Sequence, residues 1–357
     1  MPQFDKAAAL EMADGIKKLV PPAGLSLMEV CGTHTFAIAK SGLRQLLAPH
    51  IRFLSGPGCP VCVTAQEDID RALLLAREQD VIITTFGDMV RVPGRTGSLE
   101  SLRREGADVR VVYSPLDAVT LAAHTPAKKV IFIGVGFETT APAVAVAVMH
   151  AARRNLKNFF VFNLLKTVPA ALRQLLDAQG LKVDGFILPG HVCAVIGTKP
   201  FNFLAEKYNI PCAVSGFEPQ DILLAVTMIA AMKKSGRAQV QNAYTRVVAE
   251  EGNAKACEMV ERVFLPCRAK WRALGEMDAT GLALRKEFSR FDAAVNFSLP
   301  AVLSCEPSAC RCGEVLLGKI NPAQCGLFGK QCTPSAPVGP CMVSSEGACA
   351  AAYHYGG

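Results

Sequence analysis

The chain has 357 residues, of which 50% are hydrophobic and 19% are charged. This composition is typical of a globular protein and excludes an intrinsically disordered chain, and the length favours two or three domains. The formal net charge is only +7, and the lysines and arginines are scattered without a long basic run. The sequence therefore indicates neither a nucleic-acid-binding protein nor one that binds a membrane surface.

No targeting signal or membrane span is predicted. The N-terminus lacks the basic-then-apolar pattern of a secretion signal. The most apolar stretch, residues 130–149, contains Glu138, Pro142 and two glycines, which favour a strand, a turn and a helix over a membrane helix. We therefore expect a cytoplasmic protein. In that reducing compartment, cysteines serve metal binding or redox chemistry more often than structural disulfides.

Short β-rich runs alternate with helical stretches between residues 25 and 216. Several of these runs are apolar with little alternation, as in parallel strands that helices cover on both faces. The alternation predicts an α/β architecture. The predicted strands are residues 25–30, 51–55, 81–85, 109–113, 130–135, 159–163, 185–188 and 212–215.

This number of strands predicts two successive parallel-sheet lobes. We place them at residues 25–118 and 119–218, because Pro115 and Pro126 interrupt the chain in between. The third region, residues 219–357, begins with helical patterns and becomes rich in glycine, proline and cysteine after residue 304. Such a tail buries too little apolar surface to fold by itself, so it needs a covalent cross-link or a bound metal to order it. The expected helices are residues 221–234, 238–251 and 254–264.

Seven of the fourteen cysteines lie in this tail. Thiolates are soft ligands that suit iron–sulfur clusters or zinc. A structural zinc site favours two C-x2-C pairs, whereas the tail has wide and uneven spacings that suit a cluster wrapped by a loop. We therefore expect an iron–sulfur cluster, with zinc or unliganded thiols as the alternatives. The seven residues are Cys305, Cys310, Cys312, Cys325, Cys332, Cys341 and Cys349.

Reactive side chains also follow five of the predicted strands. In open parallel sheets, ligands bind beyond the carboxyl ends of the strands. Five such turns exceed what core packing requires, which indicates a functional site. In chain order they carry Cys31 with His34, Cys59 with Cys62, Asp88, Glu138, and His191.

Cys59 and Cys62 form a C-x2-C dithiol. Thr64 and Glu67 are spaced as a capping box, which predicts that Cys62 lies just before a helix N-terminus. That position favours a thiolate and a reversible disulfide. The alternative is half of a zinc site, although no second pair lies nearby. A thioredoxin fold is not indicated.

Cys31 and His34 are three residues apart on a turn that leads into a helix. Both can reach one borderline metal such as iron. Packing without a function and a Cys–His dyad for acyl transfer are the alternatives. For Asp88, Glu138 and His191, the roles of general acid, hydrogen-bond partner and solvated loop residue all stay open.

Five motifs together resemble the HypD family of hydrogenase maturation factors. They occur in the family's order and spacing and cover nearly the whole chain. They are Cys-Gly-Thr-His-Thr from Cys31, Gly-Pro-Gly-Cys-Pro-Val-Cys ending at Cys62, Gly-Phe-Glu-Thr-Thr from Gly136, Pro-Gly-His-Val from Pro189, and Met-Val-Ser-Ser-Glu-Gly-Ala-Cys ending at Cys349.

The resemblance implies a scaffold on which the Fe(CN)2CO unit of nickel–iron hydrogenases is assembled. Its implied partners are a HypC-type chaperone and a HypE-type cyanide donor. Cys31 binds the nascent iron together with a HypC cysteine in this interpretation, His34 lies beside it, and Cys59 and Cys62 are the redox-active pair. Asp88, Glu138 and His191 match family motifs around a central cleft.

The resemblance further implies a 4Fe-4S cluster held by Cys310, Cys325, Cys332 and Cys349, which leaves Cys312 and Cys341 as additional thiols. The implied fold has two similar α/β lobes and a mainly helical or irregular cluster-bearing domain, with which the N-terminal helix (residues 1–24) packs.

We hypothesise that the Cys59–Cys62 pair relays electrons between the cluster and the iron site. Two other functions remain open at this stage. One is a thiol–disulfide oxidoreductase with a structural cluster, and the other is a non-enzymatic metal-binding adaptor whose tail holds zinc.

Overall fold

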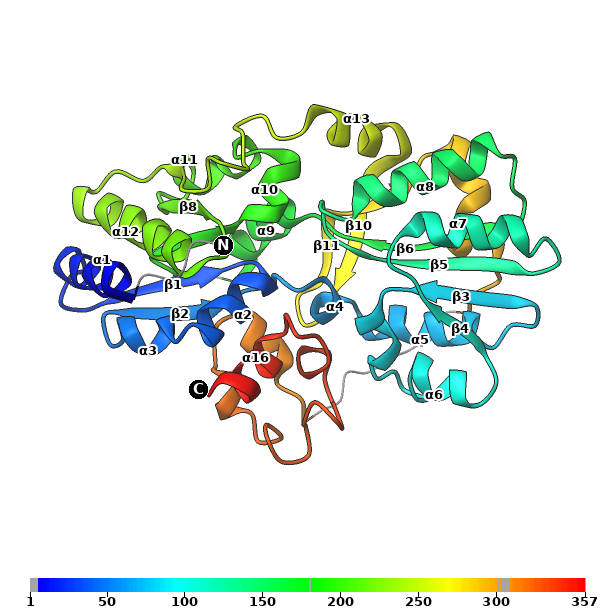
Figure 1. Cartoon of the computed structure of the whole chain (residues 1–357), viewed down its shortest axis with the longest axis horizontal. Coiled ribbons are helices and arrows are strands. Elements are labelled where there is room, and N and C mark those ends of the chain that lie inside the picture. The colour runs from blue at the N-terminus through cyan, green and yellow to red at the C-terminus, as the bar shows by residue number, and fades with distance from the viewer. Residues whose placement is uncertain (1–5, 180, 301, 303–308, 357) are drawn as a thin grey trace.

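Two parallel β-sheets, each covered by helices, form two lobes along the long axis of the computed structural model, and a cysteine-rich region packs against them (Figure 1). The structure describes residues 6–179, 181–300, 302 and 309–356. The α/β prediction is confirmed. Each of the eight predicted strands is also present, with ends within two residues of the expected positions.

Lobe 1 is built on a five-stranded parallel sheet in the order β2-β1-β7-β8-β9. Its strands are β1 (Leu25–Glu29), β2 (Ile51–Ser55), β7 (Gly185–Pro189), β8 (Cys212–Ser215) and β9 (Val240–Asn242). Its helices are α1 (Lys6–Leu19), α2 (Gly32–Lys40), α3 (Leu43–Leu47), α10 (Gly190–Ile196), η2 (Lys199–Phe201), α11 (Phe203–Glu206) and α12 (Pro219–Ser235).

Lobe 2 is built on a four-stranded parallel sheet in the order β4-β3-β5-β6. Its strands are β3 (Val81–Thr85), β4 (Asp108–Val111), β5 (Lys129–Gly136) and β6 (Phe159–Leu165). The helices of this half are α5 (Gln66–Leu75), η1 (Gly87–Arg91), α6 (Leu99–Arg104), α7 (Pro115–His124), α8 (Ala141–Arg153), η3 (Lys286–Phe291) and α14 (Ala293–Asn296).

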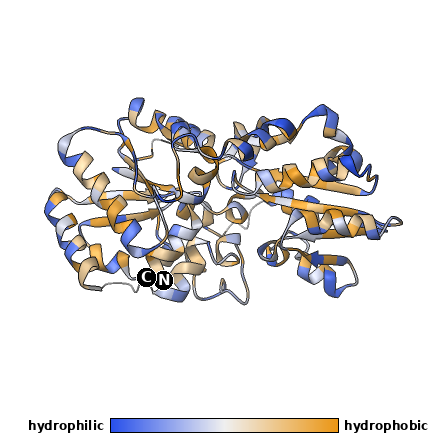
Figure 2. Cartoon of the chain, turned by 45° about the horizontal axis from the view of Figure 1, so that its top comes forward, coloured by the Kyte–Doolittle hydropathy of each residue, from blue (hydrophilic) through white to orange (hydrophobic). Residues whose placement is uncertain are grey.

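The strands are apolar because helices cover both faces of each sheet. Every residue of β3 and β7 is buried, as expected for strands of parallel sheets. In Figure 2 the strands of both sheets are coloured hydrophobic, whereas hydrophilic residues gather on the outer helices and loops. One continuous core runs from lobe 1 through the middle of the molecule into lobe 2 and the cysteine-rich region.

The expected lobe boundary between residues 118 and 119 is wrong. β3 and β4 lie in the same sheet as β5 and β6, whereas β1 and β2 pair with the later strands β7 to β9. The chain therefore crosses from lobe 1 to lobe 2 after β2 and returns before β7. Pro115 begins α7 behind a capping box formed by Ser114 and Asp117, so this proline marks a helix start inside lobe 2.

Two expectations for the helices also differ from the structure. Residues 238–251 were expected to be helical, but they contain the short strand β9, which pairs with β8 at the sheet edge. α1 packs on α12 and buries its apolar face in the core of lobe 1. It thus contacts a helix of the 219–357 region, but one that covers the sheet of lobe 1 and lies apart from the cysteine-rich part.

A hairpin that the sequence analysis did not predict connects the two halves. It consists of β10 (Phe264–Trp271) and β11 (Gly275–Leu284), which follow α13 (Ala254–Val263). Many of its residues are exposed or half-buried, so its strands lack the continuous apolar runs of the parallel sheets. The hairpin packs on β6 and on α9 (Val168–Gln179), and Trp271 pairs with Thr64.

The C-terminal region is largely irregular, as expected, and lies against lobe 1 near the start of α2. α16 (Ala348–Tyr355) packs on α2, and η5 (Pro340–Met342) packs on α4 (Pro60–Val63). Arg91 of lobe 2 donates a hydrogen bond to the Val343 carbonyl, so the tail contacts both lobes. The other short helices of the tail are α15 (Cys312–Leu316) and η4 (Pro322–Gln324).

Within the described ranges, none of the helices combines the length and the apolar character that crossing a bilayer requires. The apolar stretch at residues 130–149 forms β5, a turn and the first part of α8, as the sequence predicts.

Two neighbouring leucines of α12 test the packing of lobe 1. Leu223 is completely buried, whereas Leu224 is 38% exposed. Leu223→Ala is expected to lower the free energy of unfolding by about 2–5 kcal/mol, because it leaves a cavity in the core. Leu224→Ala on the outer face is expected to change it by less than about 0.5 kcal/mol. Chemical denaturation of both variants measures this difference, and equal losses would contradict the orientation of α12.

Candidate functional site

The turns after β1, β2, β7 and β8 meet at one edge of lobe 1, because these parallel strands are neighbours in the sheet. This edge brings together most of the residues that the sequence singled out. Cys31 and His34 follow β1, Cys59 and Cys62 follow β2, His191 follows β7, and Gly216 and Phe217 follow β8.

Cys31 is the N-cap residue of α2 and has an extended backbone. Its thiol is only slightly exposed and interacts with the backbone amides of Thr33 and His34 at the helix start. Burial raises the pKa of Cys31 to about 12, and the negative charge of Glu346 also raises it. The thiol is therefore protonated at neutral pH until a positive charge arrives to stabilise the thiolate.

His34 is completely buried one helical turn further along α2. Its Nε2 lies 2.9 Å from the Gly216 carbonyl oxygen. A carbonyl only accepts hydrogen bonds, so Nε2 carries the proton and Nδ1 has a free lone pair. Within the described part of the chain, Nδ1 has no hydrogen-bond partner. Burial lowers the pKa of His34 to about 4, which leaves a neutral ring that can bind a metal or accept a proton.

Phe217 lies between the two histidines of the site. Its ring centroid is 4.7 Å from that of His34 and 4.0 Å from that of His191, and both pairs are stacked. His191 is exposed on its other side, and partial burial lowers its pKa. The stack therefore connects the buried imidazole beside Cys31 to one at the protein surface.

Cys59 and Cys62 are joined by a disulfide. Cys59 is the N-cap of α4, and its sulfur accepts a hydrogen bond from the Cys62 amide at 3.2 Å. The expected capping box is not formed. Thr64 donates to the Pro60 carbonyl within α4, and Glu67 forms an ion pair with Lys270. An extra short helix thus starts at the dithiol itself.

At Gly58, the turn that carries the dithiol packs directly against the backbone of Cys31. A Cβ atom at position 58 would overlap the backbone nitrogen of Cys31, so only glycine permits this approach. The Gly32 amide also donates a hydrogen bond of 2.9 Å to the Gly58 carbonyl. These contacts hold the two turns in fixed register.

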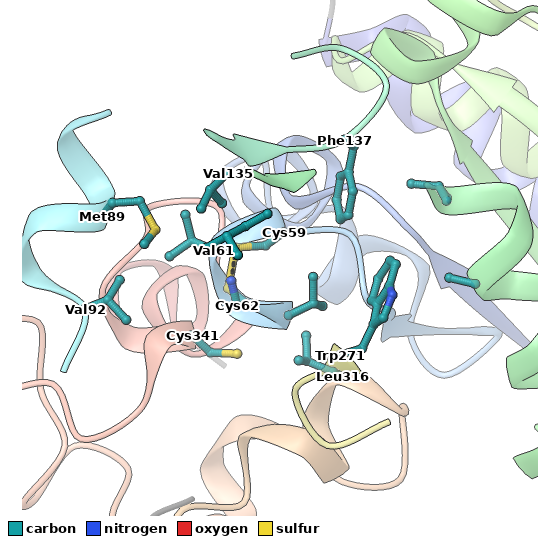
Figure 3. Close-up of a cluster of buried hydrophobic side chains, with 14 of the residues drawn as sticks. Cys59, Val61, Cys62, Met89, Val92, Val135, Phe137, Trp271, Leu316 and Cys341 are labelled. Atoms are coloured by element: carbon teal, nitrogen blue, oxygen red, sulfur yellow. Dashed lines mark hydrogen bonds between the residues drawn. A yellow bond between two sulfur atoms is a disulfide. The ribbon is translucent and has the colours of Figure 1, made fainter. Parts of the chain in front are cut away.

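The middle of the molecule encloses the dithiol in apolar side chains. Figure 3 shows Val135 and Phe137, from the carboxyl end of β5, beside Cys59, with Trp271 of the hairpin stacked against Phe137. Cys59 is 3% exposed and Cys62 is fully buried. The carboxyl end of the lobe 2 sheet therefore covers the redox-capable pair of lobe 1.

Further sulfur atoms, from the C-terminal tail, lie next to the Cys59–Cys62 disulfide. Cys62 Sγ lies 3.9 Å from the Pro340 carbonyl oxygen, and the next residue, Cys341, forms a disulfide with Cys312. This second disulfide lines one small cavity together with the remaining described thiols of the tail, which are Cys310, Cys325, Cys332 and Cys349.

The cavity has properties that fit a soft metal group. Burial raises the pKa of Cys349, and the negative charges of three other thiolates would raise it further, which shows that the four sulfurs face a common space. Among the described residues, no three ligand side chains gather closely enough to hold a single metal ion. Thiolates are the ligands of iron–sulfur clusters, and the four thiols that line this cavity match the number such a cluster takes. Cys305 lies outside the described residues.

Glu138 and Asp88 follow strands of lobe 2 and occupy different surroundings. Glu138 is 7% exposed, accepts a hydrogen bond from the Val168 amide at 2.8 Å, and has its pKa raised to about 7 by burial. Asp88 accepts a hydrogen bond of 2.7 Å from the Ser344 hydroxyl. Asp88 thus holds the tail at Ser344, which lies two residues before Glu346 in the sequence.

The sequence analysis missed three residues of the site. Glu346 accepts a 2.6 Å hydrogen bond from the Thr33 hydroxyl, and its charge acts on Cys31 and His191. Buried Cys193 lies within electrostatic range of both Glu138 and Cys31. Phe217 is the third. The contact between Glu346 and Thr33 could not be foreseen, because 313 positions separate the two residues. The only signal in the sequence was the Ser-Ser-Glu-Gly motif that contains Glu346.

The sequence was compared with protein families and with known proteins. A model of the HypD family, described as "Hydrogenase formation hypA family", matches residues 7–356. The hydrogenase maturation factor HypD of Rhodobacter capsulatus is 46% identical over 337 residues, which cover 93% of this chain and 89% of the relative. HypD of Escherichia coli K12 is 46% identical over 332 residues, with the same coverage. A putative hydrogenase expression/formation protein of Methanocaldococcus jannaschii is 42% identical over 352 residues, or 98% of each chain.

The match to the family model spans almost all described residues, and the relatives are aligned over nearly their whole length. They confirm the resemblance that the motifs indicated. The chain belongs to the HypD family of hydrogenase maturation factors.

Proposed function

We propose that the chain is the scaffold on which the Fe(CN)2CO unit of nickel–iron hydrogenases is assembled, together with a HypC-type chaperone and a HypE-type cyanide donor in the cytoplasm. One observation carries this proposal. A row of sulfur groups runs from the four-thiol cavity through Cys312–Cys341 and Cys59–Cys62 to the turn of Cys31. A redox scaffold for iron needs such a row, whereas a simple adaptor does not.

Cys31 is the anchor for the iron that is being ligated. Its buried thiol is neutral, so a divalent cation displaces the proton and stabilises the thiolate. The amides of Thr33 and His34 at the start of α2 support the same negative charge. His34 offers an unprotonated Nδ1 one turn away, as a second ligand or as the acceptor of the thiol proton.

Cys310, Cys325, Cys332 and Cys349 hold the 4Fe-4S cluster in this proposal. Such a cluster supplies or accepts single electrons. The pairing of Cys312 with Cys341 supports Cys310 as the ligand in preference to Cys312, because Cys310 remains a free thiol in the same cavity. Gly339 forms part of the wall, where a Cβ atom would lie 2.6 Å from Cys310 Sγ, so the wall leaves little room for a larger residue.

The Cys59–Cys62 disulfide takes up two electrons and two protons on becoming a dithiol and releases them in the reverse step. It lies between the tail and Cys31 and is shielded from water by Val135, Phe137 and Trp271. Because the Cys59–Cys62 pair is so deeply buried, disulfides of other proteins cannot reach it. We therefore favour an internal relay over a general thiol–disulfide oxidoreductase.

Glu138 is the proton donor and acceptor that such a relay needs. Its pKa of about 7 lets it exchange a proton near neutral pH, and one of its carboxylate oxygens has no partner among the described residues. The charges of both Glu138 and Cys31 act on Cys193, which supports a place for the carboxylate near the proposed iron site.

Replacing a dithiol sulfur tests the relay. Cys59→Ser is expected to abolish delivery of a fully ligated iron centre to the HypC-type partner, because the pair can no longer store two electrons. Infrared spectroscopy of the anaerobically co-purified proteins measures the cyanide and carbonyl bands. Cys257→Ser, which changes a partly exposed thiol outside the sulfur row, serves as the control and should retain the bands. Wild-type bands in Cys59→Ser would refute the relay.

Replacing a proposed cluster ligand tests the cofactor. Cys332→Ser is expected to lose most of the bound iron and acid-labile sulfide, because one of four thiolate ligands is removed. Metal and sulfide analysis of anaerobically purified protein measures this, with Cys267→Ser as the matched control. Stoichiometric zinc without sulfide in the wild type would instead support the metal-binding adaptor.

Glu138→Gln is expected to remove part of the pH dependence of stability. The pKa of Glu138 rises from 4.5 to about 7 on folding, so its contribution is complete below pH 4.5 and is lost as the pH rises through 7. That loss amounts to roughly 3 kcal/mol, which the glutamine variant avoids. Denaturant unfolding on both sides of this pH window measures the effect. The control is Glu261→Gln, because Glu261 is exposed and lines the same cavity as Glu138. Identical pH profiles for Glu138→Gln and wild type would exclude a raised pKa.

A further inference from the structure

A second polar site lies on lobe 2, where β6 ends. Lys166 directly follows this strand, and its amide donates a hydrogen bond of 3.0 Å to the Gly136 carbonyl at the end of β5. Its side chain lines a cavity of about 280 Å³ between α5, β6 and the β10–β11 hairpin. This is again the carboxyl edge of a parallel sheet, where such folds bind ligands.

Lys166 is only 2% exposed, yet its ammonium group has no hydrogen bond or ion pair with any residue that the structure describes. Its Nζ lies over the ring of Trp271, 6.0 Å from the ring centroid. Burial lowers the pKa of Lys166, which reflects the cost of a buried charge without a partner. Lysine side chains are rarely buried in this way unless something pairs with them.

Arg71 of α5 lines the same cavity and is also incompletely satisfied. Its Nε is buried without a hydrogen-bond partner among the described residues. Its guanidinium lies 5.7 Å from the centroid of Phe162, so the ring supports one face of the group while the N–H edges remain available. An arginine in this state is suited to a planar or tetrahedral oxyanion.

The other charges around the cavity neutralise one another. Lys270 forms an ion pair with Glu67 at 2.6 Å, and Arg268 pairs with Asp278 at 2.6 Å. Glu276, which also lines the cavity, lies 3.6 Å from Arg268. The carboxylates of Asp68 and Asp292 act on Arg71, and Asp68 also acts on Lys166, but neither carboxylate forms an ion pair with these cations. Lys166 and Arg71 are therefore the cations of the lining that have no ion-pair partner among the described residues.

We propose that this cavity binds a small oxyanion of the carboxylate, bicarbonate or phosphate class between Lys166 and Arg71. The anion gives both unpaired cations an ion-pair partner, and its oxygens accept hydrogen bonds from the ammonium and the guanidinium. The site is separate from the sulfur row, although Trp271 contacts both: it stacks on Phe137 near the dithiol and lies beside Lys166.

The chain carries a direct reporter of occupancy, because Trp271 is its single tryptophan. The full-length, anaerobically purified protein is titrated separately with formate, bicarbonate and inorganic phosphate at constant ionic strength set with chloride. The emission of Trp271 and the thermal unfolding midpoint are recorded. A saturable change in emission together with a rise in the midpoint is expected for at least one of the anions. The comparison among the three distinguishes a carboxylate site from a phosphate site.

Two variants with opposite expected effects separate binding from folding. Lys166→Met removes the charge while keeping the length of the side chain, and it should weaken binding at least about tenfold, the usual effect of losing a charged hydrogen bond. Asp68→Asn removes the competing carboxylate and should strengthen binding. Lys207→Met, which changes an exposed, ion-paired lysine outside this cavity, is the matched control and should bind the anion as the wild type does.

The absence of saturable binding for all three anions in the wild type overturns the proposal. So does an affinity that Lys166→Met leaves unchanged. If Lys166→Met does not fold, Asp68→Asn decides: tighter binding supports the anion site, and unchanged or weaker binding overturns it.

Discussion

The close approach of Gly58 to the backbone of Cys31 is the constraint on which the rest of the site depends. No other residue type leaves room for this contact, and the hydrogen bond from the Gly32 amide to the Gly58 carbonyl fixes the distance. One short segment therefore places the N-cap of α2 beside the N-cap of α4. Since Cys31 and Cys59 occupy these two N-caps, the proposed anchor thiol and the disulfide pair are positioned by the same backbone geometry.

The sulfur row passes through an apolar interior, and this determines its chemistry. Val135, Phe137 and Trp271 come from lobe 2 and the hairpin, so the enclosure exists only when both halves are assembled. Burial opposes the charged forms of thiols and of Glu138 alike. Adding an electron to such an interior is costly unless a proton or a metal ion compensates it. A carboxyl group that titrates near neutral pH is thus a necessary companion of the buried disulfide.

The local pattern of the sequence was sufficient for the strands and for most of the site. Apolar runs identified eight of the nine strands of the two sheets and missed only the short edge strand β9. The rule about strand ends identified Cys31, His34, the dithiol and His191. The division into lobes failed because sheet membership depends on pairing between distant segments, such as β1 with β7. Glu346 was missed for the same reason, since it reaches Thr33 only after the tail has folded back onto α2. The bond between Cys312 and Cys341 likewise depends on a fold of the tail that its irregular spacing does not encode.

The two sites of the molecule offer a ligand groups of opposite chemical character. Beside Cys31, the carboxylate of Glu346, the thiol and the free Nδ1 of His34 are suited to a cation. In the cavity of lobe 2, Lys166 and Arg71 are cations without an ion pair among the described residues, and they are suited to an anion. Both sites occur at the carboxyl edge of a parallel sheet, where the ends of neighbouring strands bring polar turns together without a core to neutralise them. Burying unsatisfied polar groups costs folding free energy, and a bound ligand that pairs with them would offset this cost.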